Sequence, residues 1–166
     1  ESYDELGNKT MYFYYENGLL KGIVDPTLRG VKYVYNSYGE LIGAIPATYD
    51  SASQSLKDAS PYSSDSYYDI DYEYNSKHEL EKISTNSTLY TFAYDEWGNT
   101  VSINAGNNTL ATYQYEQGNG NLITLAYGNG GSVSYVYDNL DRVVGVCYNG
   151  IREVAYVYSS SGAISS

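Results

Sequence analysis

The chain has 166 residues, including 23 tyrosines, two phenylalanines and one tryptophan, and a formal net charge of −11. This length is typical of one domain, which argues against a two-domain enzyme with an interdomain cleft. Nine Lys and Arg against 20 Asp and Glu leave no cationic patch for nucleic acid or an anionic membrane. One cysteine and one histidine exclude an intrachain disulfide framework and a cysteine-cluster zinc site. No apolar run approaches the roughly 18 residues that would span a bilayer.

An aromatic-x-Tyr pair recurs along the chain. The second aromatic falls, at steps of 21, 39, 20, 21, 22 and 21 residues, on Tyr14, Tyr35, Tyr74, Tyr94, Tyr115, Tyr137 and Tyr158. The period is therefore about 21 residues, with one double-length step, and a period of this size indicates a repeat architecture. The pairs hold 13 of the 23 tyrosines, so the unusual composition is a consequence of the repeat.

Each pair is followed by a turn signature, as in YDEWGNTVSI from Tyr94 and YNSYGELIGA from Tyr35. The shared pattern is aromatic-x-Tyr-[Asp/Asn]-x-x-Gly-[polar]-[Leu/Val]-x-x-[Ile/Val]. Tyrosines two apart share one face of a strand. Asp or Asn accepts hydrogen bonds from backbone N–H groups two or three residues on, and Gly supplies a positive φ. The pattern predicts a hairpin closed by a type I turn with a G1 bulge.

Two units depart from the glycine, with His78 and Asp141 at that position, and both residue types enter the left-handed region more readily than most. The unit at Tyr115 carries one extra residue before its glycine. The predicted structural repeat positions are Tyr14, Gly18, Tyr35, Gly39, Tyr74, His78, Tyr94, Asp95, Gly98, Tyr115, Gly120, Tyr137, Asp138, Asp141, Tyr158 and Gly162.

The predicted fold is all-β: an antiparallel meander of short hairpin repeats in a twisted, curved sheet. Repeat hairpins occupy residues 1–45 and 67–166. Residues 46–66, with seven serines and two prolines, lack the signature and are interpreted as a degenerate unit or a long hairpin loop. A short helix is allowed only around Ser53 to Ala59, since no window of a dozen residues has a 3.6-residue period.

The repeat resembles the YD repeat, also called the Rhs repeat. The best local matches are FAYDEWGNTVSI from Phe92 and YGNGGSVSYVYDNLDRVVGV from Tyr127. The chain departs from that family at His78 and Asp141, and in the arginine after the glycine, which only Arg142 supplies. Those departures concern single turns.

The resemblance implies large secreted or surface proteins whose repeats form a strip of β-sheet spiralling into a hollow shell. Such shells enclose the C-terminal toxin domain of bacterial polymorphic and ABC-type toxins, and a related shell occurs in teneurin adhesion receptors. The implied function is structural: an extracellular or cell-surface wall that encloses, displays or helps deliver another domain. The implied partner is the remainder of the parent protein or an enclosed domain.

The chain opens inside one unit (Tyr3-Asp4-x-x-Gly7-Asn8) and closes inside another (Tyr158 to Ile164). Repeat stacks normally end in caps that cover the last strand. We therefore expect an excerpt of a larger protein whose edge strands pair with another chain.

Catalysis, cofactors and metals are not expected. His78 lies at a turn and Cys147 in a strand-like run, where a free cysteine behaves as a small hydrophobe. A calcium site would draw on Asp65, Asp69 and Asp71, but no EF-hand loop is present. Most of the acids are interpreted as turn residues facing solvent rather than a pair converging on a cleft, as at Asp4, Asp95, Glu116 and Asp138.

The tyrosines allow two interpretations. Same-face tyrosines stabilise neighbouring strands through cross-strand pairs, and each phenol keeps a polar tip for water or a backbone partner. Alternatively, exposed tyrosines and Trp97 form an aromatic platform for sugars, as in a surface adhesin or a carbohydrate-binding module. The structural interpretation is favoured, and the second remains open.

Overall fold

The computed structural model describes residues 1–58 and 70–165. Within them the predicted fold class is confirmed: the chain forms β-strands and no helix, and the paired strands run antiparallel. No helix in this described part is long and apolar enough to cross a membrane. The chain divides into two compact units, residues 1–89 and residues 90–166.

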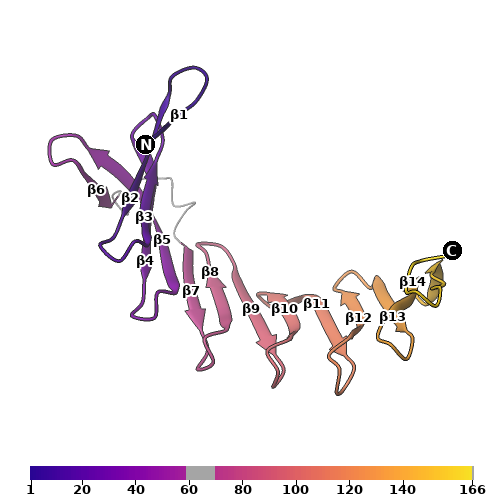
Figure 1. Ribbon diagram of the computed structural model, residues 1–166. Helices are drawn as coiled ribbons and strands as arrows, with labels where there is room; N and C mark the ends of the chain where they lie inside the picture. The colour runs from indigo at the N-terminus through magenta and orange to yellow at the C-terminus, as the bar shows by residue number, and fades with distance from the viewer. Residues whose placement is uncertain (59–69, 166) are drawn as a thin grey trace. The chain divides into compact units, whose positions relative to one another are not determined.

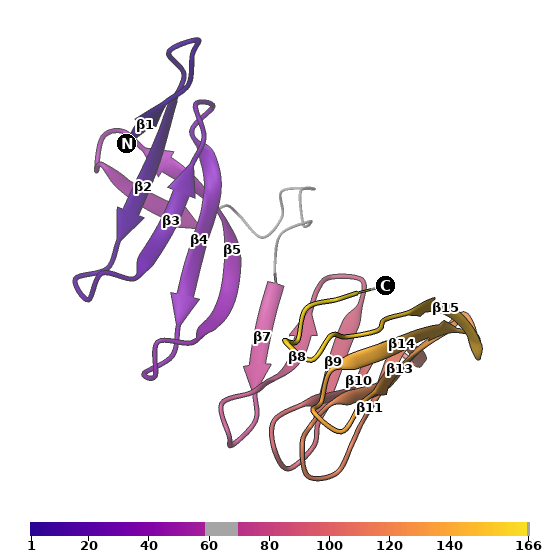
Figure 2. The ribbon, with the colours of Figure 1, turned by 45° about the vertical axis from the view of Figure 1, so that its right-hand side comes forward.

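The first unit places most strands beside their sequence neighbours (Figures 1 and 2). β5 is the exception, since it pairs with β4, with β7 and, at its far end, with β6. The strands are β1 (Ser2–Tyr3), β2 (Lys9–Tyr14), β3 (Leu20–Val24), β4 (Arg29–Tyr35), β5 (Leu41–Asp50), β6 (Ser55–Asp58), β7 (Ile70–Tyr74) and β8 (Leu80–Ser84).

The serine-rich segment begins inside β5, whose ten residues run past position 46. The helix expected around Ser53 to Ala59 is wrong over residues 53–58, which form a turn and strand β6; residues 59–66 lie outside the described residues. Asp50 closes the turn by accepting from the Ala52 N–H at 2.9 Å. Leu56 then pairs with Tyr49. Side-chain packing of Leu56 outweighs a weak local preference for helix.

Most of the core of the first unit lies on one face of β2 and β3, whereas Ala44 lies on the opposite face of the sheet, paired with Tyr33. The Phe13 and Tyr49 rings lie 5.6 Å apart, and a Cβ on Gly22 would lie 2.5 Å from Leu56 Cδ1. The β5–β6 hairpin therefore packs against β2 and β3, where glycine makes room for it. The buried hydrophobic side chains of this unit are Met11, Val24, Ala44 and Ala47.

The second unit is a meander of one layer (Figure 1). The pairing register places aromatic and aliphatic side chains on one face, such as Phe92 opposite Ile103, and small polar ones such as Ser102 and Thr112 on the other. Most of these side chains are only half-buried. The strands are β9 (Leu89–Tyr94), β10 (Thr100–Ala105), β11 (Asn108–Tyr115), β12 (Leu122–Tyr127), β13 (Ser132–Tyr137), β14 (Val143–Tyr148) and β15 (Ile151–Ala155).

Candidate functional site

Where a repeat turn opens with Asp or Asn, that residue fixes the turn through one side-chain oxygen. Asp95 Oδ1 accepts from the Trp97 N–H at 3.0 Å and from the Asn99 N–H at 2.9 Å. The sequence predicted that this oxygen accepts from N–H groups two or three residues on; the structure shows bonds from two and four residues on. The same two bonds form at Asp4, Asn36, Asn75 and Asp138.

The residue four positions later complements the first turn residue. A carboxylate accepts hydrogen bonds only, so its partner must donate. Where the turn opens with Asp, the partner is a donor: Asn8, Asn99 or Arg142. Where it opens with Asn, the partner is a carboxylate, Glu40 or Glu79. The sequence pattern recorded only a polar residue here, and comparing the two positions unit by unit would have found the rule.

The glycine position has positive φ in every repeat turn assigned above. The values are 66° at His78 and 58° at Asp141, and 74–88° at Gly18, Gly39, Gly98, Gly120 and Gly162. The strand register shifts by one residue beside these turns, as between Val34 and Tyr35, which is the bulge that accompanies such a turn.

His78 and Asp141, the two residues that replace glycine, contact the preceding hairpin. His78 Nδ1 lies 2.9 Å from Glu40 Oε1, and the rings of His78 and Tyr38 are 4.5 Å apart. Asp141 Oδ1 accepts from the side-chain amides of Asn119 and Asn121 at 2.8 and 2.9 Å. The side chains of His78 and Asp141 thus join one turn to the next, as a glycine could not. The sequence pattern did not reveal these contacts.

The second tyrosine of the repeat joins neighbouring hairpins in the same way. Its phenol donates to a carbonyl at or next to the start of the preceding hairpin's return strand, at 2.8–3.0 Å. Burial raises the pKa of four of these phenols, those of Tyr35, Tyr74, Tyr115 and Tyr137. The donor and acceptor pairs are Tyr35 with Leu20, Tyr74 with Leu41, Tyr115 with Thr100, Tyr137 with Leu122 and Tyr158 with Val143.

Tyr14 and Tyr94, the two other tyrosines at this position, end β2 and β9. Tyr14 is 61% exposed. Tyr94 is half-buried and pairs with Thr100 across its own hairpin.

These phenols lie where the backbone ladder between hairpins stops. β10 and β11 pair only from Ser102–Thr112 to Ala105–Asn108, so the ends at Thr100 and Tyr115 diverge. The Tyr115 phenol crosses the resulting wedge and satisfies the Thr100 carbonyl, which otherwise lacks a strand partner on that side.

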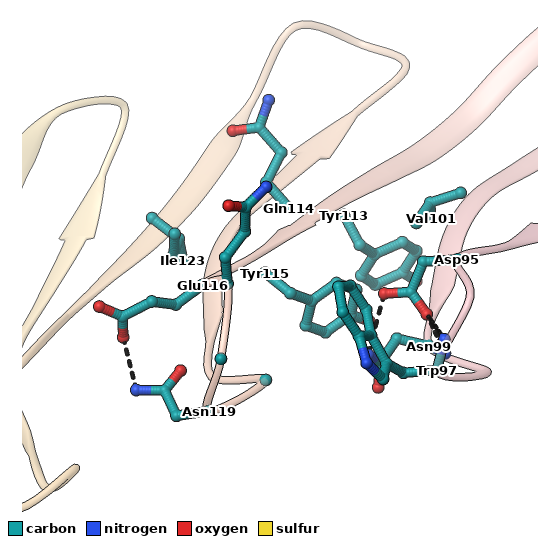
Figure 3. Close-up of a pocket in the computed structure, with 13 residues that line it drawn as sticks. Asp95, Trp97, Asn99, Val101, Tyr113, Gln114, Tyr115, Glu116, Asn119 and Ile123 are labelled. Carbon is teal, nitrogen blue, oxygen red and sulfur yellow. Dashed lines mark hydrogen bonds between the residues drawn. The ribbon is translucent and has the colours of Figure 1, made fainter.

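A groove of about 730 Å³ occupies the wedge between the β9–β10 and β11–β12 turns. Figure 3 shows Tyr113, Tyr115 and Trp97 on the side of the β11–β12 hairpin that faces β9 and β10, and the Glu116 and Asn119 side chains on the opposite side of that hairpin. The thirteen lining residues include no Lys, Arg or His. The groove is the candidate binding site of the second unit.

Two carboxylates line this groove, those of Asp95 and Glu116. Burial raises the pKa of Asp95, whereas hydrogen bonds from the Asn99 side chain and from backbone N–H groups lower it. The hydrogen bonds together have the larger effect, so the pKa of Asp95 lies below its ordinary value. Glu116 Oε2 accepts from Asn119 Nδ2 at 2.8 Å. The donors to both carboxylates are thus amides, which are neutral and do not compensate the negative charge.

The sequence analysis named residues able to bind a metal ion or act in catalysis, and the described residues include Asp71, His78 and Cys147. No group of three His, Cys, Asp or Glu lies close enough there to hold a metal ion; Asp65 and Asp69 are outside the described residues. Cys147 is half-buried in β14, paired with Ser134 and Arg152, and His78 lies at a turn.

The fold is similar to solved structures of Tc toxins. A crystal structure of TcdB2-TccC3 matches with a TM-score of 0.61 and 16% identity over 84% of this chain and 7% of that chain. The Tc holotoxin pore of Photorhabdus luminescens, with a mutation in TccC3, matches with a TM-score of 0.64 and 14% identity over 93% of this chain and 8% of that one. This chain therefore spans less than a tenth of those chains. No protein-family model matches it, and neither does any curated protein.

Proposed function

We propose that this chain is a structural segment of an extracellular or cell-surface YD-repeat β-shell that encloses, displays or helps deliver another domain, such as a toxin. The repeat motif resembles that family, and the fold is similar to the Tc toxin structures. The partners are then the remainder of the parent protein or an enclosed domain, and the chain performs no catalytic turnover.

The observation that carries the proposal is the bond from the second tyrosine of five repeats to the preceding hairpin. Within the second unit it recurs from Tyr115 to Thr100, from Tyr137 to Leu122 and from Tyr158 to Val143. The same contact therefore joins one hairpin to the next, as expected of a structure extended by repetition. A sheet held together in its own plane needs no second layer, which suits a wall.

Tyrosine also suits a wall that is wetted. Most aromatic rings of the repeat are half-buried, and those of Tyr12 and Tyr14 are exposed. A phenol keeps a polar tip where phenylalanine would expose only apolar surface. The net charge of −11 further favours solubility of a thin, open sheet.

Limited proteolysis of the natural protein that carries this chain tests the proposal, combined with electron cryomicroscopy. We expect these residues in the wall of a hollow particle, and a second domain resistant to protease until the wall is opened with denaturant. A double variant, Tyr115→Phe with Tyr137→Phe, is expected to shorten that protection, and Tyr127→Phe to leave it unchanged. A solid particle, or immediate digestion of every other domain, contradicts the shell.

Carbohydrate binding is the second candidate function, and it rests on Trp97. This indole is 67% exposed and shares the groove with Tyr113 and Tyr115, so sugar rings have aromatic faces to stack on. A glycan array probed with the chain tests it. Glycan binding that is lost in Trp97→Ala supports the candidate, and an array without signal removes it.

A further inference from the structure

We propose that Asn149 is a site of spontaneous covalent modification, in which the backbone nitrogen of Gly150 attacks Cγ of the Asn149 side chain. The attack forms the N–Cγ bond of a cyclic succinimide, and the side-chain amide leaves as ammonia with the proton of the Gly150 N–H. Water then adds to one of the two imide carbonyls and opens the ring, giving aspartate or isoaspartate. Nothing is oxidised or reduced, and water is the only co-reactant. The inference does not rest on the shell, because it concerns one turn of the second unit.

An asparagine followed by glycine is the sequence in which this attack is least hindered, because glycine has no side chain beside the attacking nitrogen. Four such pairs occur in the chain, and all of their residues are exposed. Access of water therefore does not distinguish the four sites, whereas the hydrogen bonds of each turn do. The pairs are Asn17-Gly18, Asn119-Gly120, Asn129-Gly130 and Asn149-Gly150.

The glycine N–H, which must give up its proton for the attack, is hydrogen-bonded at three of the four sites. There it donates to a backbone carbonyl three or four residues earlier, at 2.9–3.1 Å, and so closes the turn. The Gly150 N–H makes no hydrogen bond with the described residues. Its turn is closed instead by the pairing of Tyr148 with Ile151, and φ is positive at both residues between them, as in a type I′ turn. The donors and acceptors at the other sites are Gly18 and Tyr15, Gly120 and Glu116, and Gly130 and Tyr127.

The side-chain carbonyl that is attacked accepts a hydrogen bond at every site. Asn149 Oδ1 accepts from the Ser132 N–H, across from β13, at 2.8 Å. The side-chain oxygens of the other three asparagines accept from the N–H two residues on, at 3.0–3.2 Å. Attack on Cγ places negative charge on this oxygen, and a backbone N–H stabilises such charge. This bond favours reaction at all four sites, so the selection of Asn149 comes from the free Gly150 nitrogen.

The β14–β15 turn also opens at the lowest cost in contacts. Attack needs a rotation at Asn149 that turns the Gly150 nitrogen toward Cγ. Among the described strands β15 pairs only with β14 (Figure 2), and all five of its residues are exposed. The other three turns join strands that each pair on both sides. Local opening needs the least free energy where few contacts are lost, so this turn reaches the reactive geometry most often.

The test ages the chain in mildly alkaline buffer and measures aspartate and isoaspartate at the four sites by peptide mapping with mass spectrometry. A parallel sample unfolded in urea gives the rate that each local sequence has without structure. We expect Asn149 to react fastest in the folded chain, within about threefold of its own rate in urea, since no bond to the Gly150 N–H has to break. The other three sites are expected to react about fivefold or more below their own rates in urea. Circular dichroism verifies that the aged chain is still folded.

Asn149→Gln is the test variant and Asn129→Gln the matched control, because glutamine cyclises far more slowly than asparagine and each variant removes one of the four pairs. The product carries one added negative charge, so ion-exchange chromatography follows its formation. We expect the early acidic species to be lost in Asn149→Gln and to persist in Asn129→Gln, with thermal melts verifying that both variants fold. Faster reaction of the folded chain at any of the other three sites, equal protection of all four sites relative to urea, or an unchanged acidic species in Asn149→Gln overturns the proposal.

Discussion

The Tyr137 phenol donates a 2.9 Å hydrogen bond to the carbonyl oxygen of Leu122. Leu122 begins the return strand of the preceding hairpin, and the ladder between β12 and β13 stops at Thr124 and Ser134. The bond therefore closes a gap that the backbone leaves open. Because the repeat places such a tyrosine in successive hairpins, the composition of the chain follows from how hairpins are joined.

Tyr137→Phe is expected to destabilise the chain by about 0.5–1.5 kcal/mol, since the Leu122 carbonyl loses its donor while the ring remains. Urea unfolding followed by circular dichroism measures this. The matched control is Tyr127→Phe, because Tyr127 is 42% exposed and its phenol makes no hydrogen bond with the described residues; its effect should stay within about 0.5 kcal/mol. Equal effects of the two variants would show that the bond to Leu122 contributes nothing.

The fold was predictable from sequence because its signals are local. Tyrosines two apart specify a strand, and Asp95 followed by Gly98 specifies the turn that ends it. The hydrogen bonds that join neighbouring hairpins were harder to predict from sequence. The acceptor of the Tyr115 phenol lies fifteen residues earlier, and a backbone carbonyl has no signature in the sequence.

The groove was missed for a different reason. The extra residue in the turn after Tyr115 was recorded as an irregularity of the repeat. Its consequence, a Gly118 that leaves space in the wedge beside Trp97, depends on how far two neighbouring turns diverge. That divergence follows from where the β10–β11 ladder stops, which only the structure provides.

The pairing of turn residues predicts a charge-swap rescue. Asn75→Asp places a carboxylate against Glu79, whose Oε2 now accepts from Asn75 Nδ2 at 2.7 Å. We expect a loss of about 1 kcal/mol from the lost donor and the like charges. Adding Glu79→Asn recreates the arrangement of Asp95 and Asn99, and stability should return to within about 0.5 kcal/mol of the parent chain. Additive losses in a double-mutant cycle would refute the pairing.

Variants of Asp141 distinguish the effect of backbone conformation on stability from the effect of side-chain contacts. Its φ of 58° favours glycine, but its carboxylate accepts from Asn119 and Asn121. Asp141→Gly relieves the backbone and loses both contacts, so we expect a net loss below about 1 kcal/mol. Asp141→Ala loses the contacts and keeps the strain, which should cost about 1–2 kcal/mol more. Chemical denaturation orders the three proteins; an alanine variant as stable as the glycine variant contradicts the left-handed turn.

Protonation of the turn aspartates is expected to contribute to unfolding of the chain in acid. The Arg142 side chain lowers the pKa of Asp138 below its ordinary 3.8, assisted by backbone N–H groups, and the Asn8 side chain does the same for Asp4. A carboxyl with a depressed folded pKa holds fewer protons folded than unfolded. Its contribution is therefore present above about pH 4 and is lost as pH falls through the folded pKa. Urea unfolding between about pH 5 and pH 2 should show this loss, and Asp138→Asn should differ from the parent chain at the upper end and converge with it at the lower. A stability difference that stays constant across the range would contradict the role of the Asp138 charge.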